Sequence, residues 1–76
     1  MNKAEFLNLI EDVVEEDHGV LKGNEAINDI GWDSVTLMSF ITIVDSKMQI
    51  TLSPGAVAEC QTVDDLTKLV SEQLDD

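Results

Sequence analysis

Basic side chains are scarce in this chain of 76 residues: four lysines and no arginine stand against 16 acidic residues, giving a formal net charge of −12. Proteins that bind nucleic-acid phosphates need a Lys/Arg surface to displace counterions, so this composition argues against a nucleic-acid binder. The hydrophobic share of 43% is nevertheless too high for an acidic disordered tail. A chain this short accommodates one folded domain, expected over residues 1–76.

Cysteine, histidine and long apolar runs are equally scarce. The one cysteine, Cys60, cannot close an internal disulfide, and acidic residues near the amino terminus interrupt any signal peptide, so we expect a reducing, cytoplasmic setting. The longest uncharged runs, residues 34–44 and 48–58, are shorter than the roughly 20 residues that span a bilayer, so no membrane span is expected. One His and one Cys cannot supply a metal-ligand cluster or a Ser-His-Asp or Cys-His set, so we predict neither a metal site nor an enzyme.

Apolar residues at helical spacing, together with capping patterns, predict an all-α fold. The expected helices cover about residues 3–17, 34–47, 54–59 and 63–74. Their expected capping residues are Asn2, Asp33, Ser53 and Thr62. The predicted architecture is a small antiparallel bundle of three long helices and one short helix, a monomer, with a long loop between the first two helices.

Burial and charge differ along this pattern. The helix over 34–47 is apolar around most of its circumference, which predicts the most buried position in the bundle. The loop before it is long for so small a domain, and Leu21, Ile27 and Ile30 are expected to pin it to the core. An acidic cluster ends the first helix, and we interpret it as a solvated outer face in preference to a surface for a cationic partner. Its members are Glu11, Asp12, Glu15, Glu16 and Asp17.

The sequence Gly31-Trp32-Asp33-Ser34-Val35 stands where the long loop meets the second helix. It resembles the phosphopantetheine attachment motif of the acyl carrier protein family, whose usual core is Asp-Ser-Leu preceded by a Gly and a bulky apolar residue. The resemblance covers nearly the whole chain. An acidic first helix, a long loop, Asp-Ser at the start of a hydrophobic helix and a Thr-Val before the last helix follow the family's order.

The resemblance implies a carrier function with no catalytic residue in the chain. Ser34 would be esterified with 4′-phosphopantetheine, taken from coenzyme A by a separate phosphopantetheinyl transferase, and the arm's thiol would hold acyl or aminoacyl groups as thioesters. A loading enzyme and synthases would be the further partners. Asp33 would be the motif residue and helix cap. The expected partner-recognition residues are Val35, Thr36, Met38 and Ser39.

A serine at this position also has a physical rationale that does not depend on the family. A hydroxyl on the first turn of a helix lies at the edge of the bundle. The free backbone N–H groups and the positive end of the helix dipole there favour an attached phosphodiester.

The acidic residues are unevenly placed: nine lie in residues 1–33, two in 34–63 and five in 64–76. By resemblance, Ser39 and Ser46 stand where the family usually has glutamates, and Val35 replaces the usual Leu. Because charged rims set encounter rate and partner choice, we favour a specialised carrier, polyketide-like, nonribosomal-like or of another dedicated pathway. The alternatives are a housekeeping fatty-acid carrier and, in another class, an unmodified acidic helical adaptor or nucleic-acid mimic.

Three single residues near the motif have simple structural interpretations. Trp32 is expected as a half-buried anchor of the loop. Cys60 is expected as a small core hydrophobe in preference to a reactive thiol. Met38 is expected to be partly exposed beside Ser34.

Overall fold

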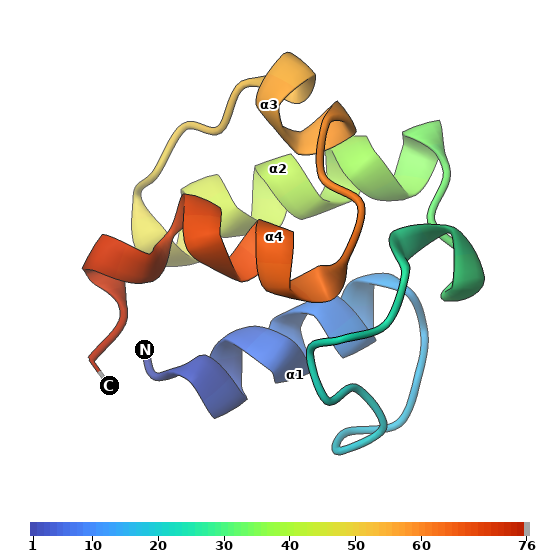
Figure 1. Cartoon of the computed structure of the whole chain (residues 1–76). Helices are drawn as coiled ribbons and strands as arrows, with labels where there is room; N and C mark the ends of the chain where they lie inside the picture. The colour runs from blue at the N-terminus through green and yellow to red at the C-terminus, as the bar shows by residue number, and fades with distance from the viewer. Residues whose placement is uncertain (76) are drawn as a thin grey trace.

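Four α-helices account for most of the regular structure in residues 1–75, the range that the computed structural model describes (Figure 1). They are α1 (Lys3–Val13), α2 (Ser34–Met48), α3 (Pro54–Ala58) and α4 (Val63–Leu69), with 3-10 helices at Ile27–Asp29 and Ser71–Gln73. The expected all-α fold is confirmed. No helix in this range has the length and apolar character needed to cross a membrane. The predicted last residue of the domain, Asp76, lies outside the described range.

The helices begin where their capping residues predict. The Asn2 side chain accepts a hydrogen bond from the Glu5 N–H at 2.8 Å, and a Glu5 carboxyl oxygen accepts the Asn2 N–H at 3.0 Å. Thr62 and Asp65 form a second reciprocal box at the start of α4. Such bonds satisfy N–H groups that have no partner within the helix, which explains why the starts are well determined by sequence.

The end of α1 differs from the prediction of a helix through residue 17, because α1 stops at Val13. Glu15 adopts a left-handed conformation with φ of 64°. The N–H groups of Glu15 and Glu16 bond back to the carbonyl oxygens of Asp12 and Glu11 at 3.3 and 2.8 Å. This is the Schellman pattern that closes a helix, formed here with a glutamate at the position that glycine usually occupies.

The end of α4 is also earlier than the predicted residue 74. The α-helical part ends at Leu69, and the Val70 N–H bonds to the Thr67 carbonyl oxygen at 3.1 Å. That shorter bond pattern tightens the last turn, and a 3-10 helix follows at Ser71–Gln73.

Helix α1 runs in one direction across the molecule, and α2 and α4 run in the other (Figure 1). Their inward faces form a single core in which Phe40 is central. Its ring meets Phe6 edge to face with centroids 6.0 Å apart and meets Trp32 in the same way at 5.4 Å. We call Trp32, Phe40 and Phe6 the aromatic column. The other buried apolar side chains are Leu9, Ile10, Leu21, Ile27, Val44, Leu52, Val57, Val63, Leu66 and Val70.

The prediction that α2 is the most buried helix is wrong for its first half. Only Phe40 and Val44 of this helix are fully buried, while Val35 is 73% exposed and Met38 is 53% exposed. Helix α2 packs against α1 and α3, and neither covers the face that carries these two residues. Helix α2 is therefore apolar on two faces: one packs into the core, and the other is left uncovered by the described residues.

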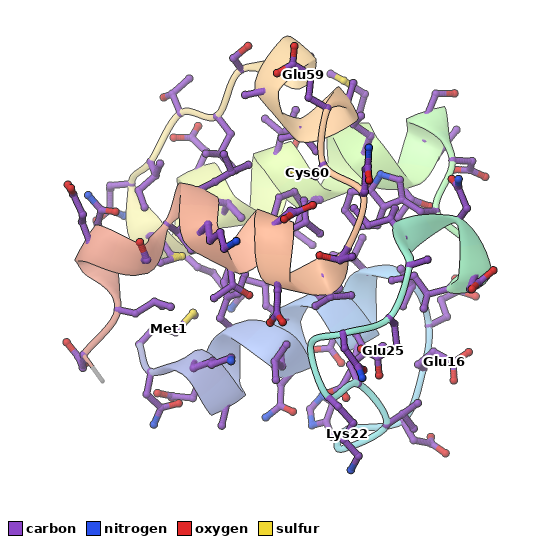
Figure 2. The ribbon with its side chains drawn as sticks, viewed as in Figure 1. Met1, Glu16, Lys22, Glu25, Glu59 and Cys60 are labelled. Atoms are coloured by element: carbon purple, nitrogen blue, oxygen red, sulfur yellow. The ribbon has the colours of Figure 1, made fainter. Side chains whose placement is uncertain are left out.

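The long loop is held by two glutamates. Glu11 is fully buried, and its Oε2 accepts the N–H groups of Gly19 at 2.9 Å and Leu21 at 2.8 Å. Glu25 accepts the N–H groups of Lys22 at 2.7 Å and Gly23 at 2.8 Å, inside the loop seen in Figure 2. The interpretation of the whole acidic cluster as a solvated face is thus wrong for Glu11. Its side chain is buried, and its carboxyl group accepts the N–H groups of Gly19 and Leu21 in place of water.

Apolar residues and α4 fix the rest of the loop. Leu21 and Ile27 are buried and Ile30 packs against the core, which confirms the expected pins. The carbonyl oxygens of Gly23 and Glu25 accept the N–H groups of Asp64 and Val63 at the start of α4, at 2.7 and 3.0 Å. Gly23 has φ of 120°, a backbone conformation that glycine adopts easily and other residues rarely do, so a substitution there would be strained. An added Cβ would also push the Asp64 carboxylate aside.

Candidate functional site

The two residues before the Asp-Ser pair guide the chain into α2. Gly31 has φ of 77°, a left-handed turn that glycine adopts without steric cost. Trp32 follows it, half-buried, with its ring against Phe40. This confirms Trp32 as the anchor of the loop, and it fixes where the next residue enters the helix.

Asp33 caps α2 and is held in its charged form. Its Oδ1 accepts the Thr36 N–H at 2.8 Å and the Thr36 hydroxyl at 2.9 Å. The hydrogen bond from the backbone N–H of Thr36, supported by that of its hydroxyl, holds the pKa of Asp33 below its ordinary value. A negative charge at the amino end of a helix is favourable, so the cap and the helix dipole support each other.

Ser34 is the first residue of α2 and is exposed. Among the hydrogen bonds of residues 1–75, none involves its hydroxyl. The hydroxyl therefore stands at the positive end of a helix of 15 residues with no internal partner to lose. A nucleophile for an external enzyme needs this combination of access and freedom.

Two apolar hollows open on either side of Ser34. The larger, about 630 Å³, lies on the outer face of α2, and we call it the α2 groove. Its lining residues are Ser34, Val35, Met38, Ser39, Thr42 and Ile43. The smaller, about 290 Å³, lies between α2 and α3, and we call it the α2–α3 hollow. It is lined by Trp32, Asp33, Ser34, Leu37, Val57 and Cys60 among others.

The structure gathers most of the predicted recognition residues. Val35, Met38 and Ser39 line the α2 groove together with Ser34. Thr36 does not, because its hydroxyl bonds to Asp33 and its side chain borders a separate hollow toward the end of α1. The sequence reasoning missed Thr42 and Ile43, although they stand seven and eight residues after Val35, the spacing of one helix face.

Cys60 lies beside this site without the properties of a nucleophile. It is partly buried, and its Sγ lies 3.5 Å from the Ala56 carbonyl oxygen. Burial raises the pKa of the Cys60 thiol, and the nearby charges of Asp65 and Glu59 raise it further. Figure 2 shows Cys60 and Glu59 near α3. A protonated, partly buried thiol is the small core hydrophobe that the sequence predicts.

The residues at Ser34 fit a phosphopantetheine group. An exposed hydroxyl can be esterified, the helix amino terminus favours the phosphate, and no acidic side chain lines the α2 groove. When bound, the group supplies a thiol that forms thioesters, chemistry that no residue of the chain needs to perform.

Comparison with known proteins identifies the class. The family model "Phosphopantetheine attachment site" matches residues 4–70, so the chain belongs to this family of non-catalytic carrier domains. The fold is similar to the solved structure of Rv0033 from Mycobacterium tuberculosis, a protein assigned as an acyl carrier protein. The two share 27% identity with a TM-score of 0.76, covering 91% of this chain and 95% of that one. No curated protein sequence matches the chain at a significant level.

Proposed function

We propose that Ser34 is the attachment residue and that the loaded arm presents acyl or aminoacyl thioesters to the enzymes of a specialised biosynthetic pathway. The observation that carries the proposal is the placement of Ser34, an exposed and unbonded hydroxyl at the start of α2. The other serines in the matched range stand elsewhere. Ser39 and Ser46 lie inside α2, and the Ser53 hydroxyl caps α3 by accepting the Ala56 N–H.

The chain's own residues would position the hydroxyl. Asp33 keeps the first turn of α2 formed, Trp32 ties that turn to the core, and the loop glutamates hold the approach. A transferase would therefore meet a preformed turn, with little ordering cost on binding.

The neutral outer face of α2 supports the specialised role. Residues 34–44 carry no charge, and the exposed positions between Ser34 and Asp45 are Val35, Met38, Ser39 and Thr42. A partner built to meet an acidic helix with basic residues would find no counter-charge here, which disfavours it. The alternative of a housekeeping fatty-acid carrier lacks that support.

The adaptor or nucleic-acid mimic has less support still. Such a protein needs its acidic groups on one continuous surface, but Glu11 is buried and Glu25 accepts hydrogen bonds from its own loop. Part of the acidity therefore holds the fold together and is not displayed to a partner.

The attachment is tested with a broad-specificity phosphopantetheinyl transferase and coenzyme A, followed by intact mass. The wild type should gain one arm, Ser34→Ala should gain none, and the matched control Ser46→Ala, an exposed serine of α2 outside the α2 groove, should gain one. An unmodified wild type, with a transferase that modifies another carrier in parallel, would overturn the proposal.

The pathway is tested by restoring charge to the neutral face. Loading of the holo protein by a fatty-acid malonyl transferase should be slow, and Ser39→Glu should raise kcat/KM several-fold. Ser71→Glu adds the same charge away from α2 and should leave the rate unchanged. A wild type that loads as fast as a fatty-acid carrier would favour the housekeeping role.

A further inference from the structure

The α2 groove is an apolar surface with no occupant from the chain itself. Val35 and Met38 are the most exposed large hydrophobic side chains of the described residues, followed by Val20. The Thr42 hydroxyl donates to the Met38 carbonyl oxygen at 3.0 Å, so it is used within the helix. Since none of the lining residues is charged, the groove is suited to an apolar ligand.

The interior below Ser34 is closed by the aromatic column. Phe40 and Phe6 have no exposed surface, and Trp32 packs its ring against Phe40. An acyl chain that entered the bundle from the α2–α3 hollow would meet Trp32 first and then Phe40 and Phe6, the rest of this column. Because protein interiors are close-packed, entry would require the rings to move.

Of the two hollows beside Ser34, the α2 groove is therefore better suited to an apolar chain than the α2–α3 hollow. The α2–α3 hollow has less than half the volume of the α2 groove, and the charged cap Asp33 lines it. Ser34 stands at one end of the α2 groove, so a flexible tether on its hydroxyl can fold back along the helix.

We propose that the α2 groove is the resting site of the acyl chain that the Ser34 arm carries, and that the aromatic column keeps this chain out of the bundle. The inference rests on the proposed function and adds the class of ligand, an apolar acyl chain. Contact with Val35 and Met38 would remove apolar surface from water on both partners, which is the driving force.

The chain has natural reporters for this test. It contains three methionines, of which Met38 lies in the groove and Met48 packs against the core, and one tryptophan, which lies at the interior entrance. We would label the methionine methyl groups and the indole N–H of the holo protein and compare acetyl-loaded with decanoyl-loaded forms by NMR. The phosphate is common to both forms, so differences report the acyl chain.

The Met38 methyl signal should move between the two loaded forms, while those of Met48 and Trp32 stay in place. Movement of the Trp32 or Met48 signal with a fixed Met38 would overturn the inference, because the chain would then enter the bundle. Three fixed signals would overturn it as well, since the chain would be free in solvent.

A matched pair of variants distinguishes contact of the acyl chain with the groove from nonspecific contact with exposed apolar side chains. Val35→Asn removes an apolar wall of the groove but leaves the Met38 reporter, and should at least halve the chain-length shift. Val20→Asn changes an exposed valine outside the groove and should leave the shift as in wild type. Equal shifts in both variants would overturn the inference. Failure to add the arm, seen by mass, would instead overturn the proposed function on which it rests.

Discussion

The loop that leads to Ser34 and the outer face of α2 that leads away from it are built in opposite ways. In the loop, two glutamates accept four backbone N–H groups, and α4 donates two more hydrogen bonds to loop carbonyls. On the outer face of α2, Val35 and Met38 project into solvent with nothing packed over them. The loop is held by hydrogen bonds from within the chain, although Glu11 Oε1 is a buried oxygen without a hydrogen-bond partner in the described residues. The outer face of α2 is left uncovered by the described residues.

The difference separates a segment that is held in place by polar contacts from a helix face that is left open. The attachment point must be placed reproducibly, which the polar contacts of the loop achieve. On the outer face of α2, the apolar side chains of Val35 and Met38 offer contact surface without demanding a fixed hydrogen-bond geometry. The net charge of −12 therefore sums over acids that hold the fold together and acids that do not.

The largest expected loss of stability comes from removing the side chain that holds the loop. Glu11→Ala leaves the buried N–H of Leu21 and the part-buried N–H of Gly19 without an acceptor and should lower the free energy of unfolding by about 3 kcal/mol. Urea denaturation followed by Trp32 fluorescence measures it. Glu16→Ala, an exposed acid in the same loop, should stay within about 0.5 kcal/mol of wild type. Equal effects of the two variants would contradict the structural role of Glu11.

A smaller effect distinguishes the two residues on either side of the Asp-Ser pair. Trp32→Ala removes a half-buried ring from the aromatic column and should lower the free energy of unfolding by about 2 kcal/mol. Val35→Ala removes an exposed side chain and should change it by less than about 0.5 kcal/mol. Denaturation followed by circular dichroism, which does not depend on the tryptophan, measures both. A stability loss at Val35 as large as that at Trp32 would show that the outer face of α2 is packed.

The sequence predicts the helix starts well because each depends on local partners three residues apart, as with Asn2 and Glu5. It predicts the ends poorly. Glu15 closes α1 in a conformation for which a glutamate carries no sequence signal. The buried position of Glu11 was equally hidden, because its hydrogen-bond partners lie eight and ten residues further along the chain.

The site shows the same limit. Asp33 and Ser34 could be placed at the start of α2 from a cap pattern and a resemblance. The open face of α2 could not, because an apolar helix circumference does not say which of its faces the neighbours cover. Thr42 and Ile43 could be assigned to the α2 groove only after the structure had shown which face of α2 is open.

The response of stability to salt should depend more on the exposed acidic residues of the loop between α1 and α2 than on the nearly uncharged helix α2. Raising ionic strength from low to moderate should increase the melting temperature by a few degrees, about the effect of 1 kcal/mol in so small a domain, because screening weakens repulsion among exposed acids. The double variant Glu16→Gln, Asp17→Asn removes two of these charges and should reduce the gain. Asp45→Asn in α2 should reduce it less. A melting temperature that does not respond to salt would show that the fold already relieves the repulsion.

The smallest expected effect lies at Asp33, where the two regions join. Its pKa is lowered in the folded chain, so its stabilisation is present above the ordinary aspartate pKa of about 3.9 and is lost as the pH falls through the folded value. Asp33→Asn keeps a good cap without the charge, so it should be slightly less stable than wild type at pH 7.

This difference should shrink as the pH falls below about 4, because the unfolded chain then binds a proton at Asp33 before the folded chain, whose Asp33 pKa is lower, does. Urea denaturation at pH 7, 5 and 3 measures it. Thr36→Val keeps the N–H donor but removes the hydroxyl bond to Asp33, so the same Asp33→Asn change made in that background should show a weaker pH dependence. A stability difference that stays constant with pH would mean that the carboxylate charge contributes nothing to the cap. The first turn of α2, which holds Ser34, would then be stabilised by the hydrogen bonds of the cap without a contribution from charge.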